Sequence, residues 1–394
     1  MHVVAVVAGV SVILIVLSDA FATIVLPRRV NRRFSPSRLA LLVAWRCWSA
    51  LARHLPGGVG REGAGRQSDF LSVFGPLALL GLVGLWATGL VLGFALLLWG
   101  IQPPSTGATS ETEFGTLMYL SGATFFTVGF GDVVPTSGIG RALAVIEGGT
   151  GFGFLAVVIS YLPTIFGAAA RREAAITLLD ARAGSPPTAA GLLSRIGHDP
   201  GALALQLRDW EQWAADLLET HLSYPILAFF RSQHDRQSWL AALVVILDVS
   251  ALVRVGIAAG GQPIPSGQAR LTFAMARHVA GDLCQILDAP PRPPSADRLP
   301  PADWNQLQRL LGAYGVELAE PDRAREHLAA MRALYEPYVS ALAERTLLSL
   351  PPWVPARDAS DDWQTTAWQH DPCEAIRAVD GVLDCHHASH GDSG

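Results

Sequence analysis

The sequence predicts an all-α membrane protein with a helical domain outside the membrane, and three observations lead to this class. Half of the 394 residues are apolar and only 16% are charged, a composition typical of chains that cross a membrane. Three apolar stretches reach the length of about 20 residues that a membrane helix needs. Proline-rich joints divide the C-terminal half into segments of helical length.

The first apolar stretch, residues 3–26, predicts an N-terminal transmembrane helix, to which we assign residues 1–26. A cleaved signal peptide is the alternative, but the stretch lacks a basic region before it and a small-residue cleavage site after it. The other two stretches cover residues 70–101 and 140–166. The segment 114–135 between them is too short to cross the membrane twice as helices.

The distribution of arginine predicts the orientation of the spans in the membrane. The sequence contains no lysine, so arginine accounts for all of its Lys and Arg content. Residues 27–69 contain nine arginines and two acidic residues, and Arg171 and Arg172 follow the third span, whereas residues 102–113 contain two glutamates and no arginine. Positive residues collect on the cytoplasmic side. Residues 27–69 and the C-terminal half are therefore predicted to be cytoplasmic, with the N-terminus outside. Within this basic segment, residues 39–55 predict an interfacial helix rather than a further span.

The segment between the second and third spans has the composition of a pathway for a dehydrated cation. Residues 114–126 predict a short helix that enters the membrane, and extended chain would then return, which is tolerated only inside protein or beside a water-filled path. Backbone carbonyls can replace an ion's water. Carbonyls that point the same way require positive φ at alternate residues, which glycine adopts at no steric cost. The predicted ion-binding residues are Thr127, Val128, Gly129, Phe130, Gly131 and Asp132.

Residues 124–132, Thr-Phe-Phe-Thr-Val-Gly-Phe-Gly-Asp, resemble the selectivity filter of potassium channels. The order of outer helix, pore helix, filter and inner helix over residues 70–166 resembles the two-transmembrane module of pore-loop channels. The resemblance implies K⁺ sites formed by the Thr127 hydroxyl and by the carbonyls of Thr127, Val128, Gly129 and Phe130, with Asp132 at the outer mouth. The alternative is a glycine-rich outer turn, which would need neither the Thr-Val pair nor the aspartate.

The motif departs from the commoner family pattern at three positions. Phe130 replaces a tyrosine whose hydroxyl tethers the filter to the pore helix, Phe126 stands where threonine often lies, and Ala123 stands where some bacterial members carry glutamate. These changes bear on filter stability and slow inactivation more than on selectivity. A complete ring of carbonyls needs four loops, and this sequence has one such motif and no internal repeat, so the resemblance implies a homotetramer.

The third span is predicted to be the inner helix, and it holds two candidate gating positions. Gly151 lies where the family commonly has a hinge glycine, and Pro163 removes a backbone donor near the cytoplasmic end. Close packing by small residues is the alternative role for the glycine. Two acids inside the spans, Asp19 and Glu147, are functional candidates by position. We interpret Asp19 as a partner of arginines within residues 28–33, and Glu147 as a hydrogen-bonding brace behind the pore.

Residues 167–350 predict a helical cytoplasmic domain, and residues 351–394 predict a disordered tail whose cysteines and histidines match no zinc spacing. The helix near residues 239–259 is apolar enough to suggest a span, but Asp248 and Arg254 favour a buried helix of a soluble bundle. Candidate helices lie near residues 171–183, 200–221, 236–259, 268–288, 303–319 and 321–349. Aromatic residues at helical spacing predict core: Trp210, Trp213, Tyr224, Phe229, Phe230 and Trp239.

The predicted function is passive conduction of K⁺ across the plasma membrane, the inner membrane of a bacterium, by a homotetramer embedded in lipid. The chain is not predicted to be an enzyme, to bind nucleic acid, or to need a cofactor beyond the permeant ion. An unidentified cytoplasmic regulator is a further predicted partner. Two alternatives stay open: a weakly selective cation channel on the same scaffold, and a membrane-anchored helical scaffold or signalling protein with a vestigial pore.

Overall fold

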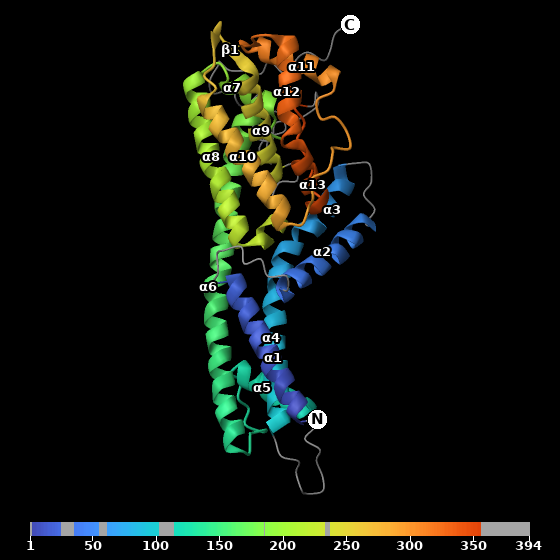
Figure 1. Ribbon diagram of the computed structural model, residues 1–394, viewed down its shortest axis with the longest axis vertical. Helices are drawn as coiled ribbons and strands as arrows, with labels where there is room; N and C mark the ends of the chain where they lie inside the picture. The colour runs from blue at the N-terminus through green and yellow to red at the C-terminus, as the bar shows by residue number, and fades with distance from the viewer. Residues whose placement is uncertain are drawn as a thin grey trace, which may run out of the picture. The chain divides into compact units, whose positions relative to one another are not determined.

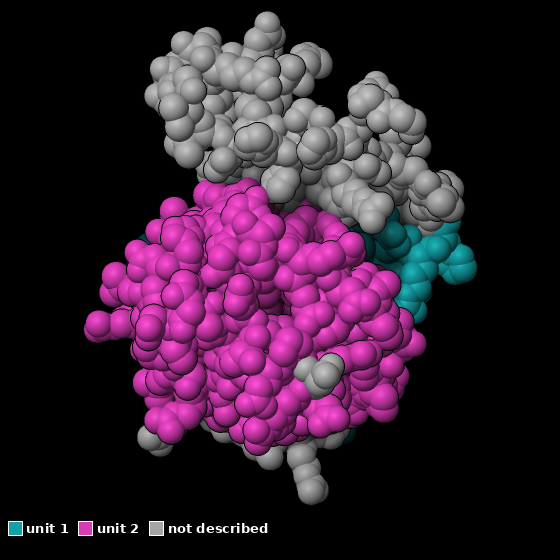
Figure 2. Space-filling model, turned by 90° about the horizontal axis from the view of Figure 1, so that it is seen from above, with its two compact units in different colours: residues 1–170, 219–231 teal, residues 171–218, 232–394 magenta. Residues whose placement is uncertain are grey.

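The computed structural model describes residues 2–24, 35–54, 61–101, 114–184, 186–232 and 237–355. The chain divides into two compact units (Figure 2). Unit 1 comprises residues 1–170 and 219–231, and unit 2 comprises residues 171–218 and 232–394. The described residues are almost entirely helical, with one small sheet (Figure 1). The chain is therefore an all-α membrane protein, as predicted.

Unit 1 contains the predicted membrane helices. They are α1 (His2–Ile24), α4 (Phe74–Ile101) and the first part of α6 (Gly138–Ala183), with the short helix α5 (Phe114–Phe125) between α4 and α6. α2 (Pro36–His54), the predicted interfacial helix, and α3 (Arg61–Ser72) precede α4, and the 3₁₀ helix η1 (Pro225–Phe229) joins the unit from far along the chain. By length and composition, the helix ending at Ile24, the helix ending at Ile101 and α6 can each cross a membrane.

Glycines allow α1 to pack closely along α4 (Figure 1). A Cβ atom at Gly9 would lie 2.7 Å from the carbonyl oxygen of Gly93, and a Cβ atom at Gly100 would lie 2.8 Å from the carbonyl oxygen of His2. A larger side chain would push the helices apart, because the opposing atoms belong to the backbone. Small residues of this kind typically drive helix association in bilayers, where burial from water contributes little. α1 is therefore an integral part of unit 1.

Asp19 links α1 to two other helices of unit 1. Its buried carboxylate accepts hydrogen bonds from the indole N–H of Trp86 on α4 (3.0 Å), the hydroxyl of Ser35 (2.9 Å) and the backbone N–H of Ser37 on α2 (3.2 Å), and also from the Ser37 hydroxyl. The partners predicted within residues 28–33 lie outside the described residues. The described contacts place Asp19 at the junction of α1, α2 and α4, and its role as a brace stays a prediction.

Unit 2 is a bundle of helices around α9 (Trp239–Gly256). The side chains from Trp239 to Val253 are all buried, packed by α7 (Ala189–Ile196), α10 (Gly267–Ile286), α12 (Pro321–Ala333) and α13 (Glu336–Thr346). Unit 2 also contains α11 (Pro301–Ala313), most of α8 (Pro200–Ser223) and the last part of α6, from Arg171. α9 is long and apolar enough to cross a membrane, but its surroundings within unit 2 agree with the predicted bundle helix.

A small sheet corrects two of the predicted helix ends. The helix predicted over 236–259 ends at Gly256, where φ is 101°, and β1 (Ile257–Ala259) follows. The helix predicted over 303–319 ends at Ala313, and Gly315, with φ of 73°, leads into β3 (Val316–Leu318). β1 pairs antiparallel with β3 and with β2 (Gln262–Pro263), in the order β2-β1-β3. Strands this short give no alternating pattern in the sequence.

Two further helix predictions need correction. The helix predicted over 321–349 divides into α12 and α13, because Pro337 in the first turn of α13 lacks a backbone N–H and disfavours helix before it. The inner helix predicted over 140–166 and the separate helix over 171–183 are one continuous helix, α6. The alanine- and arginine-rich sequence from Ala168 to Ala175 has high helix propensity and carries α6 onward.

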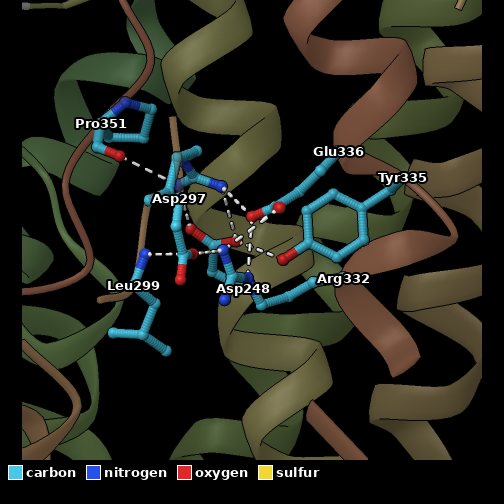
Figure 3. Close-up of polar contacts among 8 residues, drawn as sticks. Asp248, Asp297, Leu299, Arg332, Tyr335, Glu336 and Pro351 are labelled. Atoms are coloured by element: carbon cyan, nitrogen blue, oxygen red, sulfur yellow. Dashed lines mark hydrogen bonds and ion pairs between the residues drawn. The ribbon is translucent and has the colours of Figure 1, made fainter. Parts of the chain in front are cut away.

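A cluster of buried charges joins α9 to the C-terminal part of unit 2 (Figure 3). Arg298 donates hydrogen bonds to both carboxylate oxygens of Asp248 (2.6 and 3.3 Å) and to the carbonyl oxygen of Pro351 (2.9 Å). The hydroxyl of Tyr335 donates to the same aspartate (2.5 Å). Burial alone would lower the pKa of Arg298, but the carboxylates of Asp248 and Glu336 raise it above its ordinary value. The guanidinium is therefore charged, and it is paired.

Arg332 extends the cluster along α12. It donates to Asp297 (2.5 Å) and to Glu336 (2.9 Å) (Figure 3). The indole ring of Trp353 lies 5.7 Å from the guanidinium carbon of Arg332 and 5.7 Å from that of Arg298, within the range of a cation–π interaction. The cluster thus holds four segments of unit 2 together: α9, residues 297–298, residues 332–336 and residues 351–353.

Candidate functional site

The predicted filter begins at the C-terminal end of α5. The backbone N–H of Val128 donates to the carbonyl oxygen of Ala123 (2.8 Å), and the N–H of Gly129 donates to the same oxygen (3.2 Å). The N–H of Thr127 donates to the carbonyl oxygen of Thr124 (3.1 Å). The last carbonyls of a helix lack partners within the helix, so these bonds use the end of α5 to position the first residues of the loop.

Three residues of this loop have positive φ. Gly129 and Gly131 have φ of 59° and 79°, in the region that glycine adopts freely and that alternate residues need if successive carbonyls are to point the same way. Thr127 also has a positive φ, 55°, which is unexpected for a β-branched residue. A β-branched residue in this region costs about 1–3 kcal/mol, and such strain is typical of functional sites.

The loop is largely uncovered within one chain. The side chains of Phe126, Val128 and Phe130 are 61%, 51% and 70% exposed. Irregular backbone at membrane depth must be enclosed by protein or line a water-filled path. The site is therefore incomplete in a single chain.

A tyrosine of α5 tethers the aspartate that follows the predicted filter glycines. The hydroxyl of Tyr119 donates to the carboxylate of Asp132, at 3.0 Å from Oδ2 and 3.2 Å from Oδ1. The Tyr119 ring also stacks on Phe130, with ring centroids 6.4 Å apart and planes 3° apart. Both contacts join α5 to the end of the predicted filter. Tyr119 was not among the predicted site residues, although a tyrosine in an otherwise apolar short helix was a usable signal.

Glu147 of α6 lies behind the loop, fully buried. The hydroxyl of Ser121 on α5 contacts both Oε1 of Glu147 and the carbonyl oxygen of Val91 on α4, the latter at 2.8 Å. Among the described residues, Oε2 of Glu147 has no hydrogen-bond partner. These contacts join α4, α5 and α6 at one hydroxyl group, and the role of brace for Glu147 stays a prediction. Ser121 was not among the predicted site residues.

Gly151 is a close-packing position in this conformation. A Cβ atom there would collide with the carbonyl group of Phe125 at the end of α5, so only glycine lets α6 approach the start of the filter. Phe125 also packs against Phe154, one turn further along α6. Packing therefore accounts for Gly151 here, and the role of hinge stays a prediction.

Pro163 lies inside α6, which continues on both sides of it. The ring removes the backbone hydrogen bond that residue 163 would donate. The helix is thus weakened at a defined point without being interrupted.

Within the described part of the chain, no group of three His, Cys, Asp or Glu side chains could hold a metal ion. A pathway lined by backbone carbonyls does not use such groups. The arrangement as a whole supplies main-chain oxygens, one threonine hydroxyl and one carboxylate near its end.

Residues 81–167 match a protein family described as ion channel. The uncharacterized membrane protein YdjJ of Bacillus subtilis (strain 168) is 26% identical to this chain over 207 residues, which cover 52% of this chain and 60% of that protein. Protein LctB of Bacillus caldotenax and protein LctB of Geobacillus stearothermophilus are each 34% identical over 85 residues, 19% of this chain and 63% of those proteins. The chain thus spans less than two thirds of the length of these relatives. No solved structure matches the chain.

Proposed function

Residues 81–167 form a pore-loop ion channel domain, and on that premise we propose that the chain is one subunit of a homotetrameric channel that conducts K⁺ selectively and passively across the plasma membrane. In this proposal Thr127, Val128, Gly129 and Phe130 supply the oxygens that replace the water around the ion. Asp132 adds negative charge at the outer mouth, where it attracts cations.

The observation that carries the proposal is the positive φ at Gly129 and Gly131 within the sequence Thr-Val-Gly-Phe-Gly-Asp. Carbonyl groups that face one axis can coordinate a dehydrated cation without a fixed charge. Selectivity for K⁺ over Na⁺ also requires that the oxygens hold their positions. The Tyr119–Asp132 hydrogen bond and the bonds onto Ala123 supply that support.

The homotetramer follows from the incompleteness of the loop in one chain. Four copies around an axis would give each ion a full ring of oxygens. They would also cover Phe126, Val128 and Phe130, whose side chains are exposed in the single chain.

The orientation we propose follows from the arginines of residues 27–69 and from Arg171 and Arg172. The positive-inside rule puts these segments on the cytoplasmic side, with the N-terminus outside. Unit 2 then belongs to the cytoplasm, as a domain that assembles or regulates the pore.

Ion flux into liposomes that contain the purified full-length protein tests the proposal. We expect K⁺ flux that barium blocks, that Na⁺ does not replace, and that Gly129→Asp abolishes. Gly267→Asp at the start of α10 is a matched control, because a Cβ atom at Gly267 meets no atom within 4 Å, and it should conduct as the wild type does.

Three outcomes would contradict parts of this proposal. Equal Na⁺ and K⁺ flux would leave a weakly selective cation channel. Flux that persists in Gly129→Asp would remove the filter from the pathway. Absence of flux from a protein shown to be tetrameric, over a range of pH and voltage, would favour the scaffold alternative.

A further inference from the structure

A short segment from between α8 and α9 is packed into unit 1. We call residues 224–230 the wedge; they include η1 (Pro225–Phe229) and the aromatic residues at its two ends. The chain leaves unit 1 within α6, returns to it near the end of α8 and leaves again after Arg231. The wedge is therefore the part of unit 1 that is bonded on both sides to unit 2.

The wedge is held by three helices of unit 1. Tyr224 meets Tyr161 of α6 with ring centroids 5.7 Å apart, and Phe230 meets Phe166 of α6 at 5.8 Å. Phe229 lies 4.7 Å from Trp45 of α2, ring centroid to ring centroid. It also lies 5.6 Å from Phe74 at the start of α4. Burial confirms a packed core, since Ile226, Leu227, Phe229 and Phe230 are all less than 9% exposed.

Gly75 at the start of α4 forms the notch that receives the wedge. A Cβ atom at Gly75 would lie 2.7 Å from Cδ2 of Phe230 and 3.1 Å from the carbonyl oxygen of Phe229. Glycine is thus the residue that fits with the wedge in place. On the same helix, a Cβ atom at Gly81 or Gly84 would meet nothing within 4 Å.

The wedge contacts α6 on both sides of Pro163. One buried cluster contains Tyr161, Ile165 and Ala168 of α6 together with Ile226, Leu227 and Phe230 of the wedge. A helix bends most easily where proline removes a hydrogen bond. Side chains packed before and after that point resist the bend while they stay in place.

We propose that the wedge transmits movement of unit 2 to the ion pathway, by holding or releasing α6 at Pro163. The proposal rests on the channel function proposed above. A force on α8 or on the start of α9 reaches the wedge directly through the main chain. Its displacement would free α6 relative to α4 and α2, and so change the width of the pathway that α6 lines.

The test uses the full-length protein in liposomes with four variants: Gly75→Val, Phe230→Ala, their combination, and Gly81→Val as the matched control. Gly75→Val should displace the wedge, and Phe230→Ala should loosen it. Each should change the K⁺ flux at least about tenfold in one direction, which corresponds to ~1.4 kcal/mol in the gating equilibrium. Barium block and the K⁺/Na⁺ ratio should not change, because the filter is untouched. In the double variant the change in gating free energy should be smaller than the sum of the two single changes. Removal of the Phe230 ring leaves room for the valine side chain at position 75.

Hydrogen–deuterium exchange supplies a readout that does not depend on conduction. Backbone amides of residues 156–170 should exchange faster in Gly75→Val and Phe230→Ala, and at the wild-type rate in Gly81→Val. The wedge proposal is overturned if both wedge variants stay tetrameric and conduct within about twofold of wild type. It is also overturned if exchange in residues 156–170 is unchanged. Absence of flux from every protein, wild type included, refutes the proposed function instead, and the exchange rates then decide whether the wedge restrains α6.

Discussion

Replacement of Arg298 by methionine should destabilise unit 2 more than any change at its surface. The guanidinium is 9% exposed and its partner Asp248 is 1% exposed. Methionine keeps the apolar length of the side chain, so the loss is mainly one of charge and hydrogen bonds. After the substitution the carboxylate of Asp248 keeps the hydroxyl of Tyr335 as a hydrogen-bond donor but loses its counter-charge.

The magnitude follows from what Arg298 does for its neighbours. Removing one partner of a buried ion pair costs about 3–5 kcal/mol, because the other charge is left uncompensated. For a domain of roughly 150–250 residues, 1 kcal/mol lowers Tm by about 2–4 °C. A central value of about 4 kcal/mol therefore predicts a fall in Tm of roughly 8–16 °C.

Thermal unfolding of the purified full-length protein, followed by circular dichroism and tryptophan fluorescence, measures this shift. Trp353 packs against Arg298 and Arg332, so its emission should report the loss of the cluster. Arg309→Met is the matched control, since Arg309 is exposed on α11 and bonds only to its own helix among the described contacts. The control should shift the stability by less than about 0.5 kcal/mol. A fall in Tm no larger than that of the control would refute the reasoning.

Three further predictions concern the pore, the helix packing and the cysteines. Tyr119→Phe removes the hydroxyl that holds Asp132, a loss of about 0.5–1.5 kcal/mol. The current in planar bilayers should then decay about two- to tenfold faster at constant driving force. An unchanged rate of decay would contradict the tether. Gly93→Leu should separate α1 from α4 and lower Tm. Gly84→Leu on the same helix should not, because a Cβ atom at Gly84 would meet nothing within 4 Å. An equal fall in Tm for both variants would contradict the role of close packing. Burial raises the pKa of Cys284 to about 12. At pH 8.5 this thiol should therefore resist iodoacetamide while exposed Cys47 is alkylated, as peptide mass spectrometry would show. Equal labelling of the two cysteines in the folded protein would contradict the burial of Cys284.

The channel domain could be predicted from the sequence, because the sequence features that define it are local. Apolar stretches of membrane length, a short helix and a six-residue motif lie in order between residues 70 and 166. Each is defined by neighbours along the chain. The family match over residues 81–167 covers most of the same region.

The braces of the site could not be predicted, because each joins residues far apart in the sequence. Tyr119 and Asp132 are brought together by the return of the chain after α5, and Ser121 reaches Glu147 across two helices. The wedge is a stronger example. Phe229 and Phe230 were correctly expected to be buried, but nothing in their spacing assigns them to unit 1.

The helix ends were predicted wrongly for a different physical reason. Gly256 and Gly315 stop their helices with positive φ, and a glycine alone does not say whether a helix continues past it. Conversely, the inner helix was predicted to end at residue 166, but α6 continues to Ala183. High helix propensity over residues 168–175 carries α6 past its predicted end, whereas glycines with positive φ follow or end the other two helices.

The exposed loop of the single chain has a consequence for inheritance. In the proposed tetramer every ion pathway takes one loop from each of four chains, so a single faulty loop spoils the whole assembly. If faulty and intact chains are made in equal amounts and mix at random, about one tetramer in sixteen is fully intact. A defect at Gly129 should therefore be dominant over the intact allele. A defect at Gly9 or Gly93 that keeps unit 1 from folding should be recessive, because the damaged chain never joins the assembly.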